Sequence, residues 1–218
     1  MTKQQNILII GAGLCGSLLA LRLGQRGYNV HVMEMRPDLR KADISAGRSI
    51  NLAFSDRGNK AIKMVGIEDK VQALCIPMNG RMLHDRDGNT VLSNYSGRDH
   101  EYINSISRGE LNGLLLTEAE KHDNVKLFFN KKCKSIDFEK TTAFFKDNDT
   151  NTEFVEDADI IIATDGAGSA MRKSYYLGKK FLFSFSIVLM LSFYAKMQTY
   201  TMQSDWSGLK IETFLRDC

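Results

Sequence analysis

The first part of the chain alternates between apolar runs and a helix-like pattern. Asn6 to Ile10 is almost entirely apolar, which is typical of a buried parallel strand, and Leu14 to Gln25 has the apolar spacing of a helix packed against it. Gly27 stands where a helix is expected to stop, and Val30 to Glu34 predicts a second strand. The order strand, helix, strand indicates an α/β chain.

The middle of the chain combines short helices with alternating residues. The stretch SDRGNKAIKMVGIEDKVQAL predicts two short helices, the first beginning near the cap residues Ser55 and Asp56 and broken at Gly66. From Pro77 to Asn104 the residues alternate around the turn pair Asp87-Gly88, which predicts antiparallel hairpin strands. We interpret this section as an insertion into the α/β domain.

The second half begins with a capped helix and continues with strands. Ser107 and Glu110 have capping-box spacing ahead of an apolar face, so a helix is predicted from about Arg108 to His122. Four strand-like runs with polar turns between them follow, namely VKLFFN, KSIDF, TTAFFKD and ADIIIATDG. The pattern therefore predicts one α/β domain over residues 1–185 with an antiparallel supplement.

The last part of the chain has a different character. Phe181 to Ala195 is apolar over about 15 residues, fewer than the ~20 that a membrane-spanning helix requires. Residues 186–218 show no clear period, and we assign them no structure. We expect no membrane span within this chain.

Composition and charge narrow the function classes. In 218 residues, 43% are hydrophobic and 25% are charged, which is typical of a folded globular chain. The net charge of +3 is small and forms no basic stripe, so we expect no nucleic-acid partner. The four cysteines form no CxxC pair or Cys/His cluster, so neither a metal site nor a disulfide framework is predicted. With no signal-peptide layout at the N-terminus, we expect a reducing, cytoplasmic location.

A glycine pattern between the first strand and the first helix predicts a nucleotide site. Gly11, Gly13 and Gly16 form GxGxxG, in which the first glycine permits a tight turn, the second lets a pyrophosphate approach, and the third lets the helix pack closely. The phosphates would lie at the positive N-terminus of the helix. Glu34, at the end of the second strand, is placed to accept the hydroxyls of an adenosine ribose. This motif alone leaves FAD and NAD open, because both contain ADP.

A second motif decides between the two cofactors. A buried strand runs into Asp165-Gly166, and Ser169 and Arg172 complete the pattern DGxxSxxR. Alone, this stretch is equally well explained as an ordinary turn. Together, the two motifs resemble those of the flavoprotein aromatic hydroxylases, which are single-component FAD monooxygenases.

Three further segments resemble the branch of that family that hydroxylates L-kynurenine. They are GRSINLAFSDRG (47–58), PMNGRMLHDRDG (77–88) and SISRGELNGLLL (105–116), and the resemblance covers residues 6 to 185. It implies a Rossmann-like FAD-binding domain of the GR2 type, FAD as cofactor, NADPH as co-substrate, and L-kynurenine and O2 as substrates. The implied product is 3-hydroxykynurenine. Since the flavin performs the chemistry, no catalytic side chain and no metal are expected.

The resemblance also assigns individual residues. Arg81 and Tyr95 match the family's contacts to the substrate carboxylate, with part of the substrate-binding region placed at 77–104. The implied cofactor-binding residues are Gly11, Ala12, Gly13, Leu14, Cys15, Gly16, Glu34, Arg36, Leu52, Ala53, Arg108, Asp165, Gly166 and Arg172.

The sequence departs from the family at its C-terminal end. The family's third flavin motif, resembling Gly-Asp-Ala-Ala-His, is absent, and we interpret the chain as an N-terminal part that is truncated or read in a shifted frame. Two function classes remain: a flavin monooxygenase, or a non-catalytic FAD- or nucleotide-binding remnant. A plain NAD-dependent dehydrogenase is a weaker third, since the second motif and the lack of an acid/base cluster argue against it. Oligomeric state and membrane attachment stay open.

Overall fold

The computed structural model describes residues 5–41, 51–98 and 101–178. At its centre lies a sheet made of β1 (Asn6–Ile10), β2 (Asn29–Met33), β8 (Val125–Phe128) and β12 (Ile160–Ala163). The strand order is β12-β1-β2-β8, and all neighbouring strands are parallel. This sheet confirms the predicted α/β class.

The central strand β1 explains why the sheet has a layer on each face. Side chains alternate along a strand, so Ile7 and Ile9 point to one face while Leu8 and Ile10 point to the other. Ile7 and Ile9 pack in a core with the helices α1 (Leu14–Gln25) and α4 (Arg108–Glu120). Leu8 and Ile10 pack in a second core. Both faces of β1 are covered, which is why its sequence is continuously apolar.

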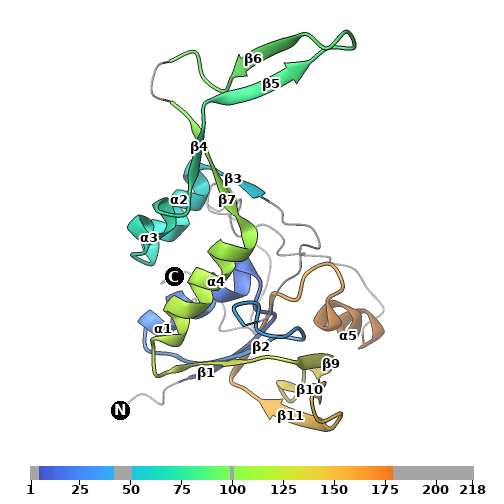
Figure 1. The fold of residues 1–218 in the computed structure, drawn as a ribbon. Helices are drawn as coiled ribbons and strands as arrows, with labels where there is room; N and C mark the ends of the chain where they lie inside the picture. The colour runs from blue at the N-terminus through green and yellow to red at the C-terminus, as the bar shows by residue number, and fades with distance from the viewer. Residues whose placement is uncertain (1–4, 42–50, 99–100, 179–218) are drawn as a thin grey trace, which may run out of the picture.

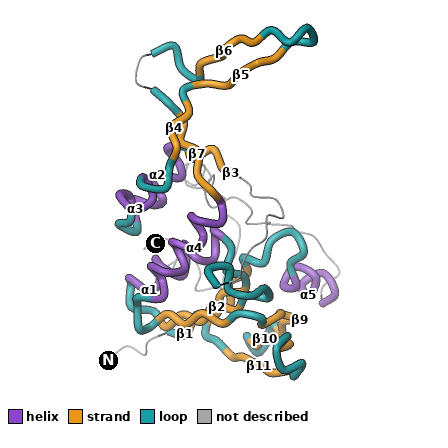
Figure 2. Tube along the Cα trace, viewed as in Figure 1, coloured by secondary structure: helices purple, strands orange, loops and turns teal. Residues whose placement is uncertain are grey.

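The second core lies against an antiparallel sheet. Its strands are β9 (Lys131–Asp137), β10 (Thr142–Asp147) and β11 (Glu153–Asp157), in the order β11-β10-β9. Ala143 and Phe145 of β10 fill this core together with Met33 of β2. The helix α5 (Ala170–Gly178) lies beside β9, where the Ser174 hydroxyl accepts a hydrogen bond from the Ile136 amide at 3.2 Å. Figures 1 and 2 show the resulting helix, parallel-sheet and antiparallel-sheet layers.

A smaller antiparallel sheet lies beyond α4. It contains β3 (Asn51–Phe54), β4 (Ile76–Met78) and β7 (Ile103–Ser107) in the order β3-β7-β4, with α2 (Asp56–Met64) and α3 (Glu68–Gln72) between β3 and β4 in the chain. Strand β7 runs directly into α4. Ser107 is the N-cap of that helix, and its hydroxyl accepts from the Glu110 amide at 3.4 Å, as the capping-box spacing predicts.

A hairpin projects from the small sheet, away from the parallel sheet (Figure 1). Its strands are β5 (Gly80–His84) and β6 (Thr90–Asn94), joined by a turn in which Gly88 has φ +85°. The Asp85 carboxylate accepts hydrogen bonds from the amides of Asp87 and Asn89. The predicted turn pair is confirmed, although the strands of this region belong to two sheets.

The short strands are where the sequence prediction was incomplete. Strand β11 has the sequence EFVED, in which three of five residues are acidic and none is fully buried, so only four strands are predicted where the structure has five. The end of the proposed domain (179–185), the apolar run from Phe181 to Ala195 and the tail 186–218 lie outside the described residues. Within the described ranges, no helix has the length and apolar character needed to cross a membrane.

We expect the β5–β6 hairpin to be the least protected strand pair of the purified chain. Met82, Leu83, Val91 and Leu92 are all exposed, and an isolated two-stranded ribbon is only marginally stable. In amide hydrogen-exchange mass spectrometry, the hairpin should exchange at least about a hundredfold faster than β1 and β2. Equal protection of the hairpin and the parallel sheet would show that another part of the protein covers it.

Candidate functional site

The turn between β1 and α1 needs two of its glycines for reasons inside the chain. Gly11 has φ +100°, and a Cβ there would lie 2.7 Å from the Thr164 carbonyl oxygen at the end of β12. A Cβ on Gly16 would overlap the Gly11 carbonyl oxygen and lie 2.5 Å from Thr164 Oγ1. The close approach of α1 to the turn therefore requires glycine at both positions, as their spacing predicts.

Gly13 is different, because nothing inside the described chain requires a glycine there. Its φ of −70° is open to any residue, and an added Cβ would meet no atom within 4 Å. Gly13 is also the N-cap of α1, so the open space lies at the positive end of this helix. The first amides of a helix have no partner within it. A phosphate group therefore fits this position chemically and sterically.

Glu34 lies beside this turn and is held as a carboxylate. It follows β2 directly and is 6% exposed. Its Oε2 accepts from the Ala12 amide at 2.8 Å, while its Oε1 accepts from the Arg36 amide at 3.0 Å and from Arg36 Nε at 2.8 Å. Burial raises the pKa of Glu34, but the hydrogen bonds from Arg36 and Ala12 outweigh this effect and hold its pKa below the ordinary value. The structure thus brings together Ala12, Glu34 and Arg36, three of the residues predicted to bind the cofactor.

The depressed pKa of Glu34 gives a pH prediction. Because the carboxyl has a lower pKa in the folded chain than in the unfolded chain, the carboxylate stabilises the fold above about pH 4.3. That contribution is lost as the pH falls through the folded-state pKa. We expect urea unfolding to show wild type more stable than Glu34→Gln at about pH 7, with the difference shrinking as the pH falls below the unfolded-state pKa of about 4.3. A difference that stays constant over this range would contradict the assignment.

Three polar residues that the sequence did not single out hold the turn in place. The Thr164 hydroxyl donates to the Gly11 carbonyl at 2.7 Å. The Ser17 hydroxyl donates to Asn112 Oδ1 at 2.8 Å, and Asn112 Nδ2 donates to the Ala12 carbonyl at 3.0 Å. The one available signal was the asparagine within the apolar pattern ELNGLLL.

The remaining predicted residues of the turn line its helical side. Leu14 and Cys15 begin α1 and are half-buried. Burial raises the pKa of the Cys15 thiol, so it stays protonated at neutral pH. Neither side chain contributes charge to the site, and their place there rests on their position in the first turn of α1.

The start of α4 lies beside β3 and carries Arg108. Pairing of Leu52 with Ile106 sets β3 next to β7, and β7 leads into α4. Arg108 is exposed and lies four residues before Asn112, which places the two on one face of the helix. Leu52 is half-buried and Ala53 is exposed, and both lie on the strand that pairs with β7 just before Arg108.

The second motif contacts the first, but its side chains also cap a helix. A Cβ on Gly11 would lie 2.9 Å from the Asp165 Cα atom, so the two motifs touch. One Asp165 oxygen accepts from the Ala170 amide at 2.7 Å at the start of α5. Gly166 has φ +74°, and Arg172 donates to the Ala167 carbonyl. The ordinary-turn interpretation therefore describes part of this motif.

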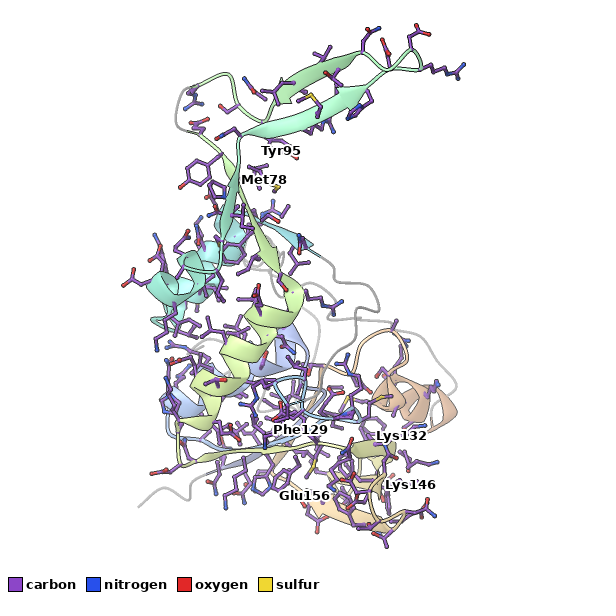
Figure 3. The ribbon with its side chains drawn as sticks, viewed as in Figure 1. Met78, Tyr95, Phe129, Lys132, Lys146 and Glu156 are labelled. Carbon is purple, nitrogen blue, oxygen red and sulfur yellow. The ribbon has the colours of Figure 1, made fainter. Side chains whose placement is uncertain are left out.

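The structure does not bring Arg81 and Tyr95 to the glycine turn. Arg81 lies on β5 opposite Ser93, and Tyr95 follows two residues later, so both share one face of the hairpin. Tyr95 lies at the base of the hairpin, on the far side of the small sheet from the glycine turn (Figure 3). Both side chains are exposed.

A polar cavity lies apart from this site. A cavity of about 450 Å³ lies between α2, α3 and the small sheet, lined in part by Asn59, Gln72 and Asn104, whose amides bond to one another. It does not include any predicted site residue. In the described part of the chain, no three His, Cys, Asp or Glu residues lie close enough to hold a metal ion.

Several curated proteins similar to this chain are named kynurenine 3-monooxygenase. The chain is 42% identical over 179 residues to a protein named kynurenine 3-monooxygenase from Anopheles gambiae, covering 82% of this chain and 37% of that protein. It is 38% identical over 172 residues to the protein of the same name from Myxococcus xanthus (strain DK1622), covering 79% and 37%. The chain thus spans 37% of the length of these two relatives.

Two solved structures similar to this chain are monooxygenases. The p-nitrophenol 4-monooxygenase PnpA from Pseudomonas putida DLL-E4 matches with a TM-score of 0.64 at 20% identity, over 79% of this chain and 43% of that one. The flavin-dependent monooxygenase PieE, solved with FAD and substrate, matches with a TM-score of 0.65 at 19% identity, over 80% and 32%. At these identities the likeness shows the fold alone, which is the predicted flavoprotein hydroxylase fold.

The family model described as FAD binding domain matches residues 4–204. This range contains both glycine motifs, the small sheet and the hairpin. The glycine turn, the fixed Glu34 carboxylate and the fold agree with that match, and the chain belongs to the FAD-binding domain family.

Proposed function

We propose that this chain is the FAD-binding part of an NADPH-dependent monooxygenase that converts L-kynurenine to 3-hydroxy-L-kynurenine. The observation that carries the proposal is Gly13, which leaves open space at the N-terminus of α1 without any need for glycine inside the chain. The names of the relatives, at 38% and 42% identity, supply the substrate.

The described residues have separate roles in holding the cofactor. The amides at the start of α1 would bind the pyrophosphate beside Gly13, and the Glu34 carboxylate would accept hydrogen bonds from the ribose hydroxyls. Arg36 and Arg108 place positive charge near the phosphates. When bound, FAD supplies the electron transfer from NADPH and the activation of dioxygen. The protein orients the cofactor and keeps water from it.

One face of the hairpin suits an amino-acid substrate with an aromatic ring. Arg81 offers a cation for the carboxylate, and Tyr95 can donate a hydrogen bond beside it. Leu83 and Val91 lie on the same face, because they occupy paired positions two residues from Arg81 and Ser93. A cation, a phenol and two aliphatic side chains match the parts of L-kynurenine.

The proposal is tested by loading the purified chain with FAD and adding NADPH, O2 and L-kynurenine. Formation of 3-hydroxykynurenine, with NADPH oxidation that depends on L-kynurenine, is the expected result. A second candidate is an FAD-binding unit without turnover, which is favoured by the exposure of Arg81 and Tyr95 at a distance from the glycine turn. Retained FAD without product would select this second candidate, and failure to bind FAD would contradict both.

Replacing Arg81 tests the substrate assignment separately. We expect Arg81→Ala to reduce the stimulation of NADPH oxidation by L-kynurenine at least about tenfold, because a charge-assisted bond to the carboxylate is lost. Flavin content should stay at the wild-type level. Arg86→Ala, in the exposed turn of the same hairpin, is the matched control and should change neither quantity. Equal loss of flavin and stimulation in Arg81→Ala would refute the assignment.

A further inference from the structure

Asn112 is a buried amide in an otherwise apolar part of α4. It is 6% exposed, and its neighbours Leu111, Leu115 and Leu116 belong to the main core. Burying an amide is costly unless its hydrogen-bonding groups are paired. Asn112 Nδ2 pairs with the Ala12 carbonyl, and its Oδ1 accepts from Ser17, which is fully buried. Both partners belong to the glycine turn or the first turn of α1, so the bonds connect α4 to the nucleotide site.

These bonds fix the direction of one peptide group. The peptide between Ala12 and Gly13 is planar and trans, so its carbonyl and its N–H point in opposite directions. Because the Ala12 carbonyl points at Asn112, the Gly13 N–H points away from α4. The preceding peptide is fixed too, since the Ala12 N–H donates to Glu34 and the Gly11 carbonyl accepts from Thr164. Asn112 therefore fixes the orientation of the Ala12–Gly13 peptide, which the bonds to Glu34 and Thr164 leave free.

We propose that Asn112 is a positioning residue for the dinucleotide, which acts by turning the Gly13 N–H toward the pyrophosphate. This inference rests on the proposed FAD-binding function. Ser17 Oγ lies 2.8 Å from Asn112 Oδ1 and 2.9 Å from the Gly13 carbonyl oxygen, and these two acceptors share its single proton. The proton donated to Asn112 Oδ1 orients the amide so that its Nδ2 group faces Ala12. The donor is thereby aligned before the ligand arrives, and binding requires no reordering of the turn.

If Asn112 had a purely structural role, its replacement would affect nucleotide binding no more than the replacement of another structural asparagine. Asn124 is the matched control for this comparison. Asn124 Nδ2 donates to the Gly24 carbonyl at 2.9 Å and to the Tyr28 carbonyl at 2.7 Å. It therefore holds the C-terminal end of α1 by the same chemistry, without contact to the glycine turn. Asn112→Leu and Asn124→Leu should both lower the melting temperature of the chain, but only the first should weaken nucleotide binding.

The test measures FAD binding by quenching of flavin fluorescence, and ADP and adenosine by displacement of FAD. In Asn112→Leu, the Kd for FAD and for ADP should rise about tenfold, whereas that for adenosine, which lacks the pyrophosphate, should change less than about twofold. Ser17→Ala keeps the bond from Asn112 to the Ala12 carbonyl but removes the hydroxyl from both Asn112 Oδ1 and the Gly13 carbonyl oxygen, and it should raise the FAD Kd about threefold. This milder variant keeps the test decisive if Asn112→Leu does not fold.

The outcomes separate the inference from the function beneath it. If adenosine binding falls as much as ADP binding, or if Asn124→Leu loses as much FAD affinity as Asn112→Leu, Asn112 has only a structural role. With Ser17→Ala alone, an unchanged Kd for FAD contradicts the positioning role. If the wild-type chain binds no FAD, the proposed function fails, and the inference fails with it.

Discussion

Gly16→Ala is expected to lower the free energy of unfolding by at least about 3 kcal/mol. An added Cβ would overlap the Gly11 carbonyl oxygen and crowd Thr164 Oγ1, and the first of these is backbone that cannot move aside. The direction is opposite to helix propensity, since replacing glycine by alanine inside a helix normally stabilises it by about 1 kcal/mol. Helix propensity therefore predicts that Gly16→Ala stabilises the chain, whereas packing against the turn predicts that it destabilises the chain. Urea unfolding distinguishes the two.

Gly113→Ala provides the control for this first prediction. Gly113 also lies inside a helix, but a Cβ there would make ordinary contacts of 3.5 Å with Arg40 and Leu39. We expect this substitution to be neutral or to stabilise the chain by up to about 1 kcal/mol. If Gly16→Ala and Gly113→Ala have similar unfolding free energies, α1 does not approach the turn as closely as the structure shows.

Gly13→Ala is expected to weaken FAD binding at least about a hundredfold while leaving the fold intact. The φ of −70° suits alanine, and no chain atom lies within 4 Å of the new Cβ. The loss of a glycine N-cap costs at most about 1 kcal/mol of stability. The methyl group would instead occupy the space that the pyrophosphate needs, so the substitution should lower FAD affinity and not the stability of the fold.

Unfolding and FAD titration of the same Gly13→Ala sample check this second prediction. Gly97→Ala is its control, because that position is equally open but is not among the predicted cofactor-binding residues, and neither quantity should change. Unchanged FAD affinity in Gly13→Ala would mean that the pyrophosphate does not approach the turn at this residue. A large loss of stability would mean that the chain itself needs this glycine.

Features fixed by neighbouring residues could be predicted from the sequence. The turn at Gly11, the helix stop at Gly27 and the hairpin turn at Gly88 all have positive φ, which glycine reveals locally. Strand β1 was predicted from its unbroken apolar run, because both of its faces are buried. The same reasoning located Glu34, since a carboxylate at the end of the second strand is part of a local spacing rule.

Features that depend on distant partners could not be predicted. Asn112 and Ala12 are 100 positions apart, and no pattern around either residue shows that their side chain and carbonyl meet. Strands β3, β7 and β11 are four or five residues long, so their pairing rather than their composition defines them. Asp165 shows that a local motif can also be ambiguous. The same residue fits a cofactor motif and accepts a hydrogen bond from the amide at the start of α5.

The most direct test of the account is the retention of FAD by the purified 218-residue chain. The protein is incubated with FAD, separated from free flavin by gel filtration, and its flavin absorbance is compared with its protein concentration. The account predicts about one flavin per chain, lost in Gly13→Ala and retained in Gly97→Ala. A chain that circular dichroism shows to be folded, but from which all flavin separates, would contradict it.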